Sequence, residues 1–205
     1  MGLEGRCACV LPTFSDLLTQ RGMGMYFCVV AVPPEYDKWI EEARLVFTGK
    51  RDQYGESWRA LSFPSLIDLL TIKAHRLQTL YSQNRQDTPA TGEKPVEDWL
   101  ALINYGALAL SALDKGPLSD ISKRLAEKLQ LARHTLAAKN ADYGNAWRLM
   151  RPLTFAELIL MKLERIRQMD HDLDKHGASI RDNLIDIINY AILFLCQYGN
   201  EIRTR

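Results

Sequence analysis

"KRDQYGESWR" at residues 50–59 returns, with half of its letters unchanged, as "KNADYGNAWR" at residues 139–148. The two stretches lie 89 positions apart, and at this offset residues 50–80 and 139–169 share eight identities in 31 positions without a gap. Composition alone accounts for roughly two such identities. The matches include the distinctive Lys, Tyr, Gly, Trp and Arg of the motif. The sequence therefore predicts an internal duplication.

Around each copy of the motif, apolar residues recur at the spacing of amphipathic helices. In the first copy we expect a helix from Glu35 that ends near Gly49, a second helix capped by Ser65, and a third over 96–113. The second copy repeats this order. Its expected helices cover 118–139, 155–169 with Thr154 as the cap, and 180–198 after a polar link at 170–179.

Only "MYFCVVAV" at residues 25–32 resembles a strand, so the sequence predicts an all-α fold. A short helical unit cannot bury its own apolar faces, and packing one copy on the other solves this problem. We therefore expect two tandem three-helix repeats packed as an internal pseudo-dimer helical bundle. The expected units are a poorly defined extension (1–34), a first repeat with a degenerate site (35–114) and a second repeat with the fuller motif set (115–205).

Composition excludes several classes of partner. The chain is 47% apolar and 25% charged, with a formal net charge of +1 and no long basic or acidic run. Bulk charge therefore predicts binding neither to duplex nucleic acid nor to a membrane surface. The four cysteines form no paired framework, and the apolar stretch 26–32 is too short to span a bilayer. We expect a cytoplasmic protein, and homodimer formation stays open.

The last predicted helix carries a narrow polar stripe. Asp182, Asp186 and Asn189 lie within about 60° of one another on a helix that is otherwise apolar. Buried carboxylates need water, cationic partners or a metal ion. With Glu157 as a third oxygen donor they predict a Mg²⁺ site. In the alternative, Asp182 stabilises the helix start and Asp186 pairs with a cation of the preceding helix, Lys162 or Arg165.

Two cations share one face of that preceding helix. Lys162 and Arg165 lie three residues apart among apolar side chains, as Lys73 and Arg76 do in the first copy. Such a pair can neutralise the acidic stripe or bind phosphate oxygens. The alternative places both at the rim of a core helix, with their aliphatic stems buried.

The repeated motif lies between helices and combines rings with cations. Tyr143 or Trp147 can stack on a base while Lys139 or Arg148 binds phosphate, and the glycine after Tyr143 permits a sharp bend. Asp142 adds a carboxylate beside them. In the alternative, the two rings fill the core and only their polar tips reach water.

Together, "K-x-x-D-Y-G-x-x-W-R", "K-x-x-R" and "D-x-L-I-D-I-I-N-Y-A" resemble the nucleotide modification associated domain 1 family, over about residues 36–200. This resemblance implies a role in nucleotide metabolism or base modification. More distantly, "RDNLIDIINYAILF" resembles the acidic third helix of MazG-like all-α nucleoside triphosphate pyrophosphohydrolases, whose E-x-x-D element binds Mg²⁺. Asp186 matches the aspartate of that element and Asn183 stands at its glutamate, while the partner E-x-x-E element is absent.

We therefore expect a protein that binds a nucleotide or modified nucleotide and acts as a Mg²⁺-dependent hydrolase centred on the second copy. Asp182 and Asp186 would bind metal, Asn189 would position water or substrate, and Lys162 and Arg165 would hold phosphate. The base or sugar pocket would use Asp142, Tyr143 and Trp147.

The first copy is expected to support this centre. It has Gln53 for Asp142 and Ala101 for Asp186, and it retains one acid, Glu97. It would serve as a scaffold or contribute Lys73, Arg76 and Asn104. Two alternatives remain open: a non-catalytic module that binds a nucleotide or a base-modifying enzyme, and a buried polar network that only sets helix register.

Overall fold

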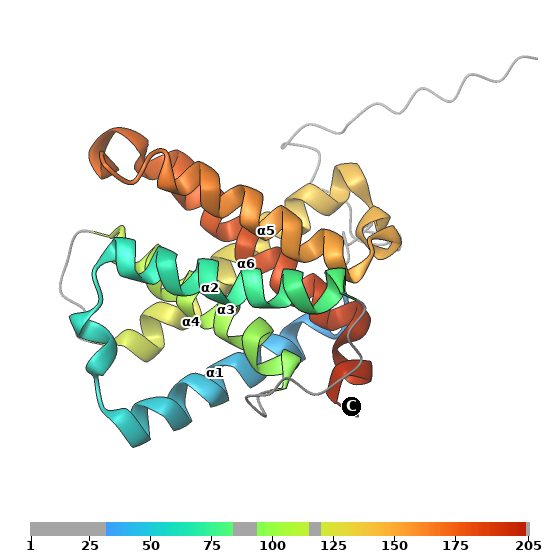
Figure 1. Cartoon of the computed structure of the whole chain (residues 1–205), viewed down its shortest axis with the longest axis horizontal. Coiled ribbons are helices and arrows are strands. Elements are labelled where there is room, and N and C mark those ends of the chain that lie inside the picture. Colours follow the sequence, from blue (N-terminus) through green and yellow to red (C-terminus); the bar gives the residue numbers. More distant parts are fainter. Residues whose placement is uncertain (1–31, 84–93, 115–119, 204–205) are drawn as a thin grey trace, which may run out of the picture.

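The computed structural model describes residues 32–83, 94–114 and 120–203, and for 141–143 the backbone alone. These ranges form helices joined by turns and contain no strand, which confirms the predicted all-α class (Figure 1). Nearly all of the strand-like stretch 25–32 lies outside them. The helices are α1 (Tyr36–Tyr54), η2 (Ser57–Ala60), α2 (Phe63–Ser82), α3 (Pro95–Ala112), α4 (Ile121–Tyr143), η3 (Ala146–Leu149), α5 (Pro152–Arg167) and α6 (Leu173–Arg203).

The duplication is visible in the element boundaries. The short helices η2 and η3 lie 89 positions apart, and so do the ends of α1 and α4. Both long helices stop at a glycine with positive φ, 62° at Gly55 and 55° at Gly144. Side chains with a Cβ rarely adopt this conformation. The bend expected after Tyr143 is present, whereas the predicted end of α1 near Gly49 is wrong, because Gly49 stays helical.

Three further predicted helix starts are wrong, each for a local reason. Helix α2 begins after Ser62, whose side chain accepts a hydrogen bond from the Ser65 amide at 3.3 Å, so Ser65 is not the cap. Helix α5 begins at Pro152, which places Thr154 inside its first turn. Helix α6 begins seven residues before 180, because Asp172 Oδ1 accepts from the Lys175 amide at 3.0 Å.

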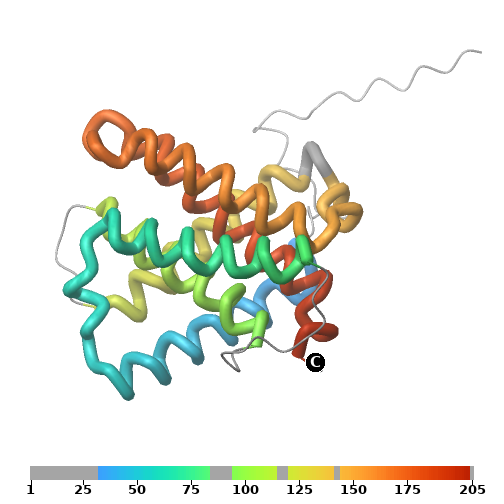
Figure 2. The backbone as a smooth tube through the Cα atoms, viewed as in Figure 1, coloured from blue at the N-terminus to red at the C-terminus, as the bar shows by residue number. Residues whose placement is uncertain are grey.

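The two repeats share one core. Helices α3 and α6 pack against each other at the centre, α2 packs along α5, and α1 and α4 each contact both central helices (Figure 2). Trp99 of α3 and Phe194 of α6 stack with ring centroids 3.9 Å apart, and both rings are fully buried. Neither repeat could bury these faces alone, which is the physical basis of the pseudo-dimer.

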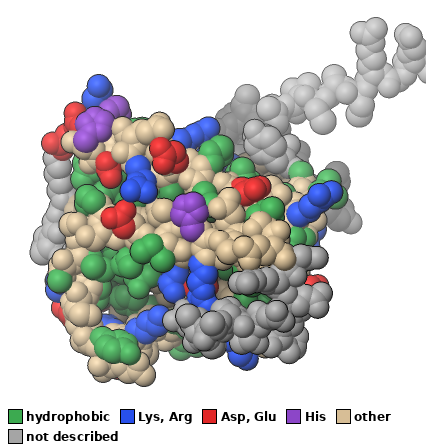
Figure 3. Space-filling view, viewed as in Figure 1, with side chains coloured by type: hydrophobic (Ala, Val, Ile, Leu, Met, Phe, Trp, Pro, Cys, Tyr) green, Lys and Arg blue, Asp and Glu red, His purple; other side chains and the backbone are tan. Residues whose placement is uncertain are grey.

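The exposed face in Figure 3 mixes acidic and basic side chains. Such interspersed charge fits the small net charge of the sequence. Of the helices in the described ranges, none combines the length and the apolar character needed to cross a membrane.

Candidate functional site

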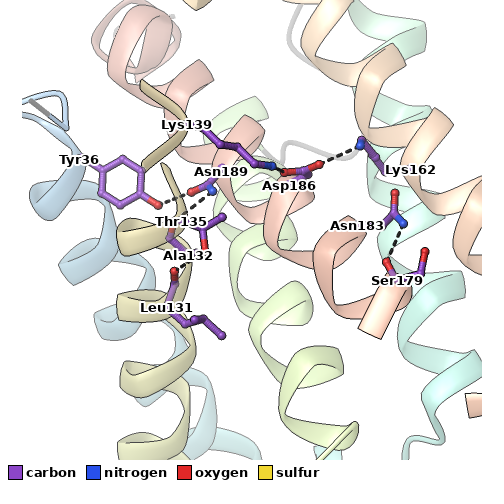
Figure 4. Close-up of polar contacts among 10 residues, drawn as sticks. All are labelled: Tyr36, Leu131, Ala132, Thr135, Lys139, Lys162, Ser179, Asn183, Asp186 and Asn189. Atoms are coloured by element: carbon purple, nitrogen blue, oxygen red, sulfur yellow. Dashed lines mark hydrogen bonds and ion pairs between the residues drawn. The ribbon is translucent and has the colours of Figure 1, made fainter. Parts of the chain in front are cut away.

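Helix α6 places Asp186 between two lysines from different helices (Figure 4). Lys162 Nζ of α5 donates to Asp186 Oδ2 at 2.8 Å, and Lys139 Nζ of α4 donates to Oδ1. The side chains of Asp186 and Lys162 are only 15% and 14% exposed. The pairing with Lys162 that the sequence left open is therefore present, and both carboxylate oxygens face an ammonium group.

One turn further along α6, Asn189 is satisfied by the fold itself (Figure 4). Its Nδ2 donates to the Ala132 carbonyl at 3.1 Å, and its Oδ1 accepts from the Tyr36 hydroxyl at 2.6 Å. Burial raises the pKa of Tyr36 above its ordinary value of 10.0, so the phenol remains a protonated donor. Tyr36 belongs to α1, so the first repeat completes the polar network of the second.

Replacing Tyr36 with phenylalanine is expected to destabilise the protein by about 1–3 kcal/mol, because Asn189 Oδ1 is left buried without its donor. Chemical denaturation at neutral pH measures this loss, with the exposed Tyr54→Phe as the control. Since folding raises the pKa of Tyr36, its contribution is full below about pH 10 and is lost as the pH rises further. Alkaline destabilisation that is as steep in Tyr36→Phe as in the wild type would contradict this assignment.

The other predicted metal ligands do not form a cluster of three acidic groups with Asp186. Asp182 and Glu157 are both exposed. Within the described ranges, no group of three or more His, Cys, Asp or Glu side chains is placed to hold a metal ion. This arrangement does not fit the multi-carboxylate site expected for Mg²⁺, and Mg²⁺ dependence stays a prediction. Arg165, expected to bind phosphate, is also exposed.

The tryptophan and arginine of the motif contact each other in both repeats. The Arg148 guanidinium lies 4.5 Å from the Trp147 ring centroid, and Arg59 lies 4.9 Å from that of Trp58. Trp147 is buried in the core, and its Nε1 tip is buried as well rather than reaching water as the structural alternative expected, whereas Trp58 is only half-buried. The side chains of Asp142 and Tyr143 lie outside the described structure.

In the first repeat, the buried acid is Asp98, which was not among the predicted site residues. The Asp98 side chain is 2% exposed, with Lys73 Nζ 2.9 Å from Oδ1 and Arg76 donating to Oδ2 at 2.6 Å. Glu97, expected to be the retained acid, is exposed. The detectable signal was the three-residue spacing of Asp98, Ala101 and Asn104, which places all three on one helix face.

A pocket of about 400 Å³ opens in the first repeat, between α1, the η2 turn and α3. On this side the surface in Figure 3 is hollowed, with hydrophobic and basic side chains at the rim. The lining includes the aromatic residues Tyr54, Trp58 and Tyr105, the cations Lys50 and Arg51, and the amide of Asn104.

Ala101 also lines this pocket, and the duplication pairs it with Asp186. In the second repeat, the longer Asp186 side chain reaches the lysine that corresponds to Lys50, namely Lys139. Alanine has no such group, so the same position in the first repeat is left open. The sequence placed the active centre in the second repeat, whereas this pocket lies in the first.

The motif residues that line the pocket belong to a known family pattern. Comparison with protein families matches residues 50–113 and 139–198, together more than half of the chain, to "Nucleotide modification associated domain 1". Comparisons with curated proteins and with solved structures gave no match. The similarity to MazG-like pyrophosphohydrolases has no support from these comparisons. The chain belongs to the nucleotide modification associated domain 1 family, whose domain it matches in two tandem segments.

Proposed function

We propose that this chain is a nucleotide-binding protein of nucleotide modification and that it holds its nucleotide in the pocket of the first repeat. The observation that supports this proposal is the combination of aromatic rings and cations around about 400 Å³. This volume lies within the range of about 300–1,000 Å³ that is typical of small-molecule sites. The family description points to the same class of ligand.

Both the base and the phosphate of a nucleotide have matching groups in the pocket. Tyr54, Trp58 and Tyr105 offer ring faces on which a base can stack. Lys50 and Arg51 offer positive charge for the phosphate. Arg51 NH1 also donates to Ser122 Oγ of α4 at 2.6 Å, which fixes the direction of the guanidinium group before a ligand arrives.

Hydrolysis of the bound nucleotide is a separate proposal with less support. Asp186, the residue expected to lead the chemistry, has both carboxylate oxygens engaged by Lys139 and Lys162. Binding without turnover, the alternative left open by the sequence, requires none of these groups to change partners.

Calorimetric titration of the full chain with nucleoside mono- and triphosphates of each base, with and without Mg²⁺, tests the proposal. We expect at least one nucleotide to bind and to raise the melting temperature by mass action. Phosphate and pyrophosphate release in the same samples would reveal turnover. If no nucleotide gives heat of binding or a shift in melting temperature, the proposed function is wrong.

Replacing Ala101 with aspartate is expected to weaken nucleotide binding by at least about tenfold. The new carboxylate would pair with Lys50, as Asp186 does with Lys139, and would repel the phosphate. Calorimetric titration measures the loss, and the melting curve checks that the variant folds. Ala178→Asp introduces the same charge at an exposed position of α6 and serves as the control. Equal affinity in the Ala101→Asp variant would place the ligand elsewhere.

A further inference from the structure

We infer that Asn104 recognises the base of the nucleotide by accepting a hydrogen bond from a base N–H group. This inference rests on the proposed function and deepens it, since it assigns a specificity-determining residue and a class of base edge. The ligand must present an N–H donor to the pocket, so nucleotides whose base N–H is replaced by N–CH₃ are excluded.

The orientation of Asn104 is set by the fold. Its Nδ2 donates to the Ala43 carbonyl of α1 at 2.8 Å, which assigns the two ends of the amide. Asn104 is only 7% exposed, and it lines the pocket. Among the described residues, no group donates to its Oδ1. A buried acceptor left without a donor costs about 1–3 kcal/mol, which a ligand donor would recover.

The second repeat provides an internal comparison. Asn189 corresponds to Asn104, and its Nδ2 makes the equivalent bond to Ala132, the counterpart of Ala43. Its Oδ1, however, accepts from the Tyr36 hydroxyl. At the offset of 89 positions Tyr36 corresponds to a leucine, Leu125, which has no donor to offer. The same amide is thus complete in the second repeat and lacks a donor in the first, beside the described pocket.

The hydrogen bonding of the motif tryptophan, by contrast, does not differ between the two repeats. Neither Trp58 Nε1 nor Trp147 Nε1 has a hydrogen-bond partner among the described residues, although only Trp58 lines the described pocket. An unpartnered indole is therefore common to both repeats. Of these two pocket-lining groups, the Asn104 carbonyl is the one whose partner differs between the repeats, and for this reason we assign base recognition to it.

The experiment pairs the tightest-binding nucleotide with an analogue that differs only at the N–H nitrogens of the base. The analogue is N3-methyl for thymidine or uridine, N1,N2,N2-trimethyl for guanosine, N4,N4-dimethyl for cytidine and N6,N6-dimethyl for adenosine nucleotides. Calorimetric titration of the wild-type chain should show at least about tenfold weaker binding of the analogue, because sites built to bond an N–H reject ligands that lack it.

A variant separates hydrogen bonding from steric exclusion. In Asn104→Leu we expect the affinity for the unmethylated nucleotide to fall towards the affinity for the analogue. Asn200→Leu, at an exposed position near the end of α6, should keep the wild-type ratio of the two affinities. Equal binding of both ligands by the wild type would overturn the inference, and so would a ratio that Asn104→Leu leaves unchanged. If Asn104→Leu does not fold, the ratio of the two affinities in the wild type is the deciding measurement. Absence of all nucleotide binding would instead refute the proposed function, and the inference with it.

Discussion

Replacing Asp98 with alanine is expected to destabilise the protein by about 3–5 kcal/mol, the usual cost of removing one partner from a buried ion pair. The Asp98 carboxylate is 2% exposed and holds two cations of α2, Lys73 and Arg76, each 25% exposed. Without it, two positive charges remain at the edge of the core, close to each other and partly removed from water. Denaturation in urea at neutral pH measures the loss.

Glu97→Ala is the matched control for this prediction, because Glu97 is the neighbouring acid on α3 and is exposed. Surface substitutions of this kind usually change the free energy of unfolding by less than about 0.5 kcal/mol. A loss below about 1 kcal/mol in Asp98→Ala would show that water solvates the two cations well enough on its own. Asp98 would then contribute little to joining α2 and α3.

Replacing Phe194 with alanine is expected to cost about 3–5 kcal/mol as well, here through the cavity it leaves. The ring is fully buried on α6. It stacks on Trp99 of α3 at 3.9 Å and meets Phe155 of α5 edge-on at 5.7 Å. Urea denaturation gives the size of the loss. Leu149→Ala, at a position that is 87% exposed, should change stability by less than about 0.5 kcal/mol.

Phe194→Ala also tests whether the repeats share one core. Because the ring contacts helices of both halves, the variant should still unfold in a single transition, at a lower denaturant concentration. Two separate transitions, or a loss close to that of Leu149→Ala, would contradict the shared core.

Much of the fold follows from the sequence, because helical periodicity and the repeated motif are local signals. The sequence predicts the all-α class, the order of the helices and the correspondence between Asn104 and Asn189 in the two repeats. Helix ends could not be predicted, since Gly49 and Gly55 look alike in the sequence and only Gly55 adopts a positive φ. That conformation depends on the turn into η2.

The candidate site was less predictable, for a different reason. The motif occurs in both repeats, and the sequence favoured the copy with more carboxylates. Whether the space beside the motif lysine is filled depends instead on side-chain reach. Asp186 extends to two lysines where Ala101 cannot, and Tyr36 reaches Asn189 across 153 positions of the chain. Contacts of this kind depend on how α1 packs against α6, which no local pattern reports.

The bond between Tyr36 and Asn189 bears on how the protein can be dissected. A fragment that begins at α4 would lack the phenol that completes its own interior, and a fragment that ends after α3 would lack the aromatic surface of α6. Neither half is therefore a spare copy of the other. Having diverged after doubling, the two segments now depend on each other, and bisecting the gene would yield two incomplete products rather than two smaller versions of the whole.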